Sequence, residues 1–112
     1  MRKASGRRPG RAPYGYRYVD GSWLIVPQEA TIVQRIYSEF TRTYLRVALS
    51  EIARDLNIEG VDTARGGRWH ASTIWAILRN PVYCGEDMPA IITVATWDAA
   101  QRRLRTLRPG PA

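Results

Sequence analysis

The sequence has few of the residues from which catalytic and metal sites are usually built. Its 112 residues include one cysteine, Cys84, and one histidine, His70. A single cysteine excludes an internal disulfide bond and the cysteine pairs of a zinc site. The sequence also lacks a GxxxxGK[ST] phosphate loop, a GxGxxG motif and a serine with a partnered base. We therefore predict no catalytic residue, no metal site and no cofactor for this chain.

Long apolar runs are missing as well. No segment is long and apolar enough to span a bilayer, and the charged N-terminus lacks the apolar segment of a signal peptide. We therefore expect no membrane partner and a cytoplasmic location. Hydrophobic residues nevertheless make up 45% of the chain, which is sufficient for the core of one domain.

Positive charge is present in excess and is unevenly distributed. The net charge is +7. Residues 1–18 carry six positive charges and residues 64–85 carry three, and neither segment contains an acidic residue. Residues 19–63 carry four positive and seven negative charges. Segregated positive charge favours a polyanionic partner such as nucleic acid. The alternative is a basic surface that has no partner.

The first basic segment predicts a flexible arm over residues 1–12, because glycine, proline, serine and arginine dominate it. The run GRRPGR is similar to short arms that lie in the narrow minor groove of A·T-rich DNA. Arg7, Arg8 and Arg11 are therefore candidate DNA contacts.

A β-hairpin is expected next, because Asp20-Gly21 is a strong two-residue turn. This turn pairs Tyr18 with Trp23 and Tyr16 with Ile25, so that the four side chains share one face. The aromatic side chains could stack on bases. Packing against a helix is the favoured interpretation, because an isolated hairpin is marginally stable.

Helical periodicity then predicts helices over residues 28–44, 48–57, 71–79 and 94–107. The expected buried positions of the first helix are Ala30, Val33, Ile36, Tyr37, Phe40 and Tyr44. Thr93 is expected to cap the last helix. The fold class predicted is mainly α with a small β-hairpin (α+β), containing a helix-turn-helix-like DNA-binding arrangement.

The third helix carries the second candidate DNA contact surface. Ile74, Ile77 and Leu78 would pack inward, leaving small and polar side chains outside, which suits close approach to base edges. The predicted DNA-binding residues of this region are Arg65, Arg68, His70, Ser72, Thr73 and Arg79. The connection before this helix is longer than the usual helix-turn-helix turn, so the likeness is one of topology only.

Five segments in order carry a family resemblance: APYGYRY, EATIVQRIYSEF, EIARDLN, TARGGRW and STIWAILRNPVYCG. They resemble the recombinase domain of large serine recombinases, the phage integrase and transposon resolvase group. The closing PAIIT and TWDAAQRRL segments resemble the connection from that domain to a zinc ribbon. The resemblance covers residues 12–107.

The resemblance implies a DNA-binding domain of a site-specific serine recombinase, which binds attachment-site duplex DNA during DNA integration or recombination. The catalytic serine domain is absent from this chain, so the chain alone is not expected to be an enzyme. The implied division is a basic arm over 1–12, the recombinase domain over 13–92, and a C-terminal helix with a loose tail over 93–112, leading toward a zinc ribbon. The resemblance also implies that the full-length recombinase is encoded by a bacterium or a phage and is oligomeric. The present chain is expected to be a monomeric fragment of it.

Three positions depart from the family pattern. Ala48 replaces a serine-type cap, His70 replaces the common serine or threonine, and the glycine usual before the second helix is missing within YLRVA. Two other functions remain open: a fragment that binds another protein, and a stand-alone repressor, which would need a dimer and a palindromic site.

Overall fold

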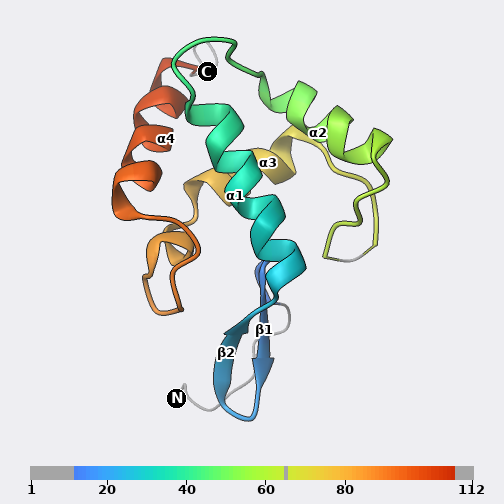
Figure 1. The fold of residues 1–112 in the computed structure, drawn as a ribbon, viewed down its shortest axis with the longest axis vertical. Coiled ribbons are helices and arrows are strands. Elements are labelled where there is room, and N and C mark those ends of the chain that lie inside the picture. Colours follow the sequence, from blue (N-terminus) through green and yellow to red (C-terminus); the bar gives the residue numbers. More distant parts are fainter. Residues whose placement is uncertain (1–11, 65, 108–112) are drawn as a thin grey trace.

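The structure, a computed structural model, describes residues 12–64 and 66–107. In this part of the chain an antiparallel hairpin precedes four α-helices (Figure 1). The elements are β1 (Tyr16–Val19), β2 (Ser22–Ile25), α1 (Pro27–Thr41), α2 (Leu49–Ile58), α3 (Ala71–Arg79) and α4 (Val94–Thr106), with a short 3-10 helix at Pro81–Cys84. This arrangement confirms the predicted α+β class.

The hairpin has the predicted register, with Tyr16 opposite Ile25 and Tyr18 opposite Trp23. Asp20 (φ 47°) and Gly21 (φ 82°) both adopt the left-handed backbone that this type of turn requires. Tyr16 is buried, and its hydroxyl donates to the Pro89 carbonyl oxygen at 2.6 Å. Tyr18 and Trp23 are half-buried and pack edge to face. The hairpin therefore joins the core at the Tyr16 end.

The junction between hairpin and α1 depends on Gly15 (φ 101°). A Cβ atom there would lie 3.0 Å from Ile91 Cδ1, which is a tight contact, and the positive φ itself disfavours any side chain. The Gly15 N–H donates to Glu29 Oε1 at 2.7 Å, and Glu29 lies in the first turn of α1. Pro27 begins this helix, where its missing N–H costs nothing. The hairpin and α1 are thus joined by packing and by a hydrogen bond to a carboxylate.

The predicted end of α1 and the predicted burial of Tyr44 are wrong. The helix ends at Thr41, Arg42 is extended, and the Tyr44 side chain is 71% exposed. Leu45 takes φ 60°, a left-handed conformation that favours glycine. The turn before α2 therefore forms without the glycine expected there, at the cost of backbone strain, and it carries Tyr44 out of the helical stripe.

The start of α2 shows what the alanine at position 48 changes. Glu51 Oε1 accepts from the Ala48 N–H at 2.9 Å, which is one half of a capping box. The other half needs an acceptor on the cap residue, and an alanine side chain has none. The helix therefore lacks a contribution of about 1 kcal/mol that serine would supply.

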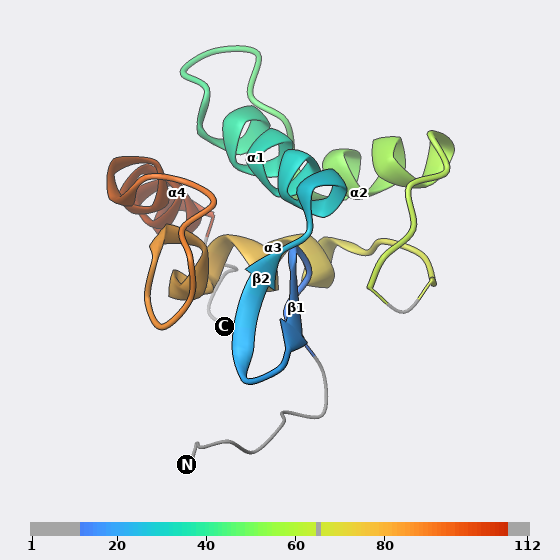
Figure 2. The same cartoon turned by 60° about the horizontal axis from the view of Figure 1, so that its bottom comes forward.

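The core lies where the four helices meet the base of the hairpin. Trp69, Tyr37 and Tyr83 are its largest buried side chains. In Figure 1 α3 crosses behind α1, and in Figure 2 it runs below α1 between α2 and α4. Ala100 and Leu104 of α4 are buried in the same core. None of the described helices has the length and apolar character needed to cross a membrane.

Candidate nucleic-acid interface

The outward face of α3 has the composition that its periodicity predicts. Ile74, Ile77 and Leu78 are buried. Ser72, Ala76 and Arg79 are exposed on the opposite side, with Thr73 half-buried beside them. Two small side chains, Ser72 and Ala76, lie between Arg79 and the exposed Trp75 on one flank and Thr73 on the other. A helix with such a face can approach a grooved surface closely.

The N-terminal end of α3 is held by a side chain of α2. Asn57 Oδ1 accepts from the Trp69 N–H at 2.7 Å, and Asn57 Nδ2 donates to the Trp69 carbonyl oxygen at 2.9 Å. One amide therefore satisfies both backbone groups of the residue two positions before α3. The sequence indicated Asn57 only as a helix stop. Its role depends on a contact between distant segments.

The buried Trp69 ring anchors the same entry point. Its Nε1–H donates to the Val61 carbonyl oxygen at 2.9 Å, and its ring meets the Tyr14 ring edge to face at 5.0 Å. One sequence signal could have identified this residue. Trp69 and Ile74 stand at the two apolar positions of a hydrophobic staple around the start of a helix, and both are buried.

The C-terminal end of α3 is held by α1 and α4. The Tyr37 hydroxyl donates to the Ile77 carbonyl oxygen at 2.7 Å. Gln101 Nε2 donates to the Leu78 carbonyl oxygen at 2.6 Å. Trp97 Nε1 donates to the Asn80 carbonyl oxygen at 3.2 Å. Burial raises the pKa of the Tyr37 hydroxyl well above its usual value, so it stays protonated and keeps donating. The helix is thus fixed at both ends.

A hollow of about 600 Å³ separates α3 from the base of the hairpin and the glycine loop. Three predicted DNA-binding residues line it: Arg68, His70 and Thr73. Ala12 and Pro13 line it too, so the chain that follows the basic arm passes beside α3. No acidic residue is among the described residues that line this hollow.

The remaining predicted residues lie elsewhere. Ser72 and Arg79 are exposed on the outward face of α3 and do not line the hollow. The Arg79 guanidinium lies over the Trp75 ring, 4.8 Å from its centroid. Arg7, Arg8, Arg11 and Arg65 lie outside the described residues. Arg68, His70 and Thr73 therefore lie together along the hollow. Ser72 and Arg79 lie on a different side of α3.

The loop before α3 is organised by Thr63. Its Oγ1 accepts from the Gly67 N–H at 2.9 Å, and its carbonyl oxygen accepts from the Gly66 N–H at 3.0 Å. Arg68 follows this turn and is exposed. His70 occupies the cap position of α3 without making a side-chain cap hydrogen bond. The helix therefore begins without the side-chain cap that serine or threonine would supply.

Glu59, the acidic residue that directly follows α2, has a structural role. Arg35 binds Glu59 through two contacts of 2.7 Å. Hydrogen bonding from Arg35 lowers the pKa of the Glu59 carboxyl. Within residues 12–64 and 66–107, no group of three potential ligands is placed to hold a metal ion. Glu59 thus pairs α2 with α1.

A family model described as Recombinase matches residues 27–106, which is the span from the start of α1 to the end of α4. One similar solved structure is described as "Crystal Structure of a LSR-DNA Complex". It aligns with a TM-score of 0.69 and 20% identity over 93% of this chain and 35% of that chain. This chain therefore spans about a third of the length of that protein, and the likeness at this identity shows the fold. No curated protein matches the sequence. Because the family model covers most of the sequence, the chain belongs to the Recombinase family.

Proposed function

We propose that this domain binds duplex DNA as the attachment-site-binding domain of a site-specific serine recombinase. The observation that carries the proposal is the outward face of α3. It presents Ser72, Ala76 and Arg79 beside the exposed Arg68, and it is held by hydrogen bonds at both ends. A rigid helix with small outward side chains suits insertion into the major groove, where arginine and serine can contact base edges. The structural likeness to a chain from an LSR–DNA complex supports this use of the fold.

The remaining parts of the proposal concern the neighbours of α3. Residues 1–12 would act as a basic arm in the minor groove, and Arg65, Arg68, His70 and Thr73 would contact phosphates at the start of α3. The domain over 13–92 would be followed by a C-terminal helix and tail, over 93–112, that lead toward a zinc ribbon. The serine that attacks DNA would lie in a separate catalytic domain of an oligomeric parent, while this chain alone binds as a monomer without catalysis.

A salt series of DNA-binding titrations tests the proposal. Affinity for duplex DNA should fall steeply as salt increases, because each phosphate contact releases condensed counterions, with a slope of about −0.9 per contact in a double-logarithmic plot. Fluorescence anisotropy with a labelled duplex measures this slope. A folded protein that fails to bind duplex DNA at low salt would contradict the proposal.

Replacing Arg79 tests base reading by α3. Arg79→Ala should cost about 1–3 kcal/mol of binding free energy and relax the preference at one base position, because a guanidinium that reads guanine makes two hydrogen bonds. Arg79→Lys keeps the charge and loses the planar fork, so it should recover only part of the preference. The measurement is a competition titration over all single-base variants of one site. An equal loss for every variant would show that Arg79 holds phosphate only.

A further inference from the structure

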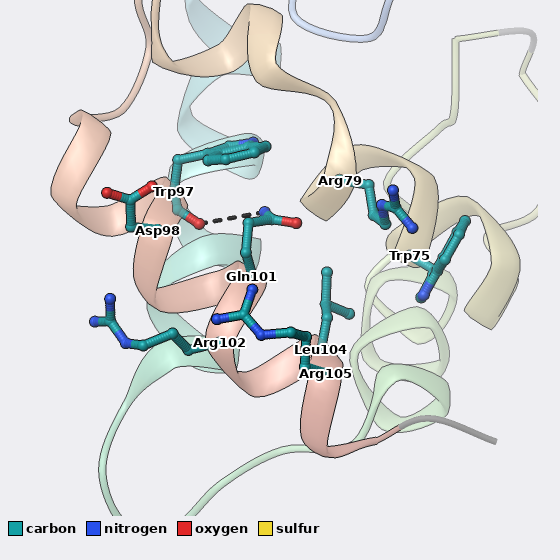
Figure 3. Close-up of a pocket in the computed structure, with 8 residues that line it drawn as sticks. All are labelled: Trp75, Arg79, Trp97, Asp98, Gln101, Arg102, Leu104 and Arg105. Atoms are coloured by element: carbon teal, nitrogen blue, oxygen red, sulfur yellow. Dashed lines mark hydrogen bonds between the residues drawn. The ribbon is translucent and has the colours of Figure 1, made fainter. Parts of the chain in front are cut away.

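A groove of about 720 Å³ lies on the other side of α3, between this helix and α4 (Figure 3). Trp75 and Arg79 of α3 form one side. Residues of α4 form the other side: Trp97, Asp98, Gln101, Arg102, Leu104 and Arg105. In Figure 3 the Arg105 side chain runs back along α4 toward Gln101, whereas the Arg102 side chain points away from α3. Arginine residues of both helices thus line the groove.

The arginines of α4 fall into two structural classes. Arg103 Nη1 donates to the carbonyl oxygens of Phe40 at 2.6 Å and Val47 at 3.3 Å, and its guanidinium lies 4.3 Å from the Phe40 ring centroid. Arg103 therefore connects α4 to α1 and to the following loop. Arg102 and Arg105 are exposed, and no ion pair of either is found in the described part of the chain. These two cations have no structural partner of opposite charge there.

Cations near a helix C-terminus also complement the helix dipole, which would explain these arginines without any ligand. That explanation does not require a groove. Arg79 comes from a different helix, yet it lines the same groove as Arg102 and Arg105. Asp98 is the one acidic residue among the described residues that line it. The resulting concave surface carries net positive charge and suits an anion with an extended shape.

We propose that the α3–α4 groove binds the sugar-phosphate backbone of the same duplex that α3 reads, with Arg102 and Arg105 as phosphate contacts. This inference rests on the proposed function. A helix in the major groove, which is about 12 Å wide, has one DNA backbone on each side. Arg68 and the hairpin-side hollow lie on one flank of α3, and the groove lies on the other. The two flanks then bind the two backbones, while Gln101 holds α3 between them.

Replacing Arg102 and Arg105 by alanine, singly and together, tests the groove. Each replacement should reduce the salt slope by about 1, because one phosphate contact is lost. Raising the salt from about 50 to 200 mM weakens DNA binding by a certain factor. For the double variant this factor should be roughly tenfold smaller than for the unsubstituted chain. Arg102→Lys and Arg105→Lys should keep most of the slope, because the phosphate contact needs mainly the charge.

Arg54→Ala is the matched control. It also removes one exposed arginine from a helix, but Arg54 is on α2, where its guanidinium lies 3.5 Å from Asp55, and it does not line the α3–α4 groove. The salt slope of Arg54→Ala should equal that of the unsubstituted chain. A slope reduced equally by Arg54→Ala and Arg105→Ala would show a general charge effect and overturn the inference.

Ethylation interference on the bound duplex gives a second readout. The double variant should lose interference at phosphates on one side of the major groove and keep it on the other. The unsubstituted chain could bind DNA while the folded double variant keeps the same salt slope and the same interference pattern. In that case the groove proposal fails and the proposed function stands. A lower melting temperature with unchanged DNA binding would assign both arginines to the helix dipole. If the unsubstituted chain does not bind DNA, both proposals are overturned.

Discussion

Trp69→Ala should lower the free energy of unfolding by about 3–5 kcal/mol, the range for truncating a large buried aromatic residue. The Trp69 side chain is 2% exposed. Its loss would leave a cavity at the entry to α3, remove the edge contact with Tyr14 and leave the Val61 carbonyl oxygen without its indole donor. Because domains of this size are stable by about 5–15 kcal/mol, a large part of the stability would be lost. Urea denaturation followed by far-UV circular dichroism measures the change.

Trp75→Ala is the matched control, because it makes the same substitution on α3 at a side chain that is 44% exposed. It should change the free energy of unfolding by less than about 1 kcal/mol, as exposed substitutions usually do. It would also remove the ring beneath the Arg79 guanidinium, so its effect is expected on DNA binding. Equal midpoints for the two variants would show that Trp69 does not anchor α3.

Deleting residues 1–11 should have the largest effect on DNA affinity. The deletion removes five positive charges. If all five contact phosphates, the salt slope falls by about 4.5, which makes the loss of affinity between 50 and 200 mM salt several hundredfold smaller. The location of Ala12 and Pro13 beside α3 supports this expectation, because the arm begins where the proposed DNA contacts lie. The same anisotropy titration measures it.

A charge-conserving variant provides the control for the arm. Replacing Arg7, Arg8 and Arg11 by lysine keeps all the charges, so the salt slope should stay near that of the full chain. Replacing the same three by glutamine should remove about 2.7 units of slope. If the deletion leaves the slope unchanged, the arm does not contact DNA.

Local patterns in the sequence predict much of this fold. Asp20-Gly21 fixes the hairpin register, because only left-handed residues close a two-residue turn of this type. Thr93 caps α4 as predicted, accepting from the Thr96 N–H at 3.1 Å. The buried and exposed faces of α3 follow from helical periodicity, because each residue's position around the helix is fixed by its spacing. These features depend on residues close together in the chain.

Features that depend on distant contacts could not be predicted in this way. The helix α1 ends at Thr41, where Arg42 becomes extended although no glycine or proline marks that end in the sequence. The Asn57 amide holds Trp69 across 12 positions of sequence. Arg102, Arg103 and Arg105 look alike in sequence, yet only the fold separates Arg103, which holds α1, from the two that line the groove.

The double anchoring of α3 separates the residues that hold the helix from those that face outward. Asn57, Tyr37 and Gln101 fix its ends from other helices. Ser72 and Ala76 of the outward face are exposed and take no part in this anchoring. Exchanges at these exposed positions should cost little folding free energy. A lineage carrying this domain could therefore change its target preference one residue at a time, with each intermediate remaining folded and open to selection.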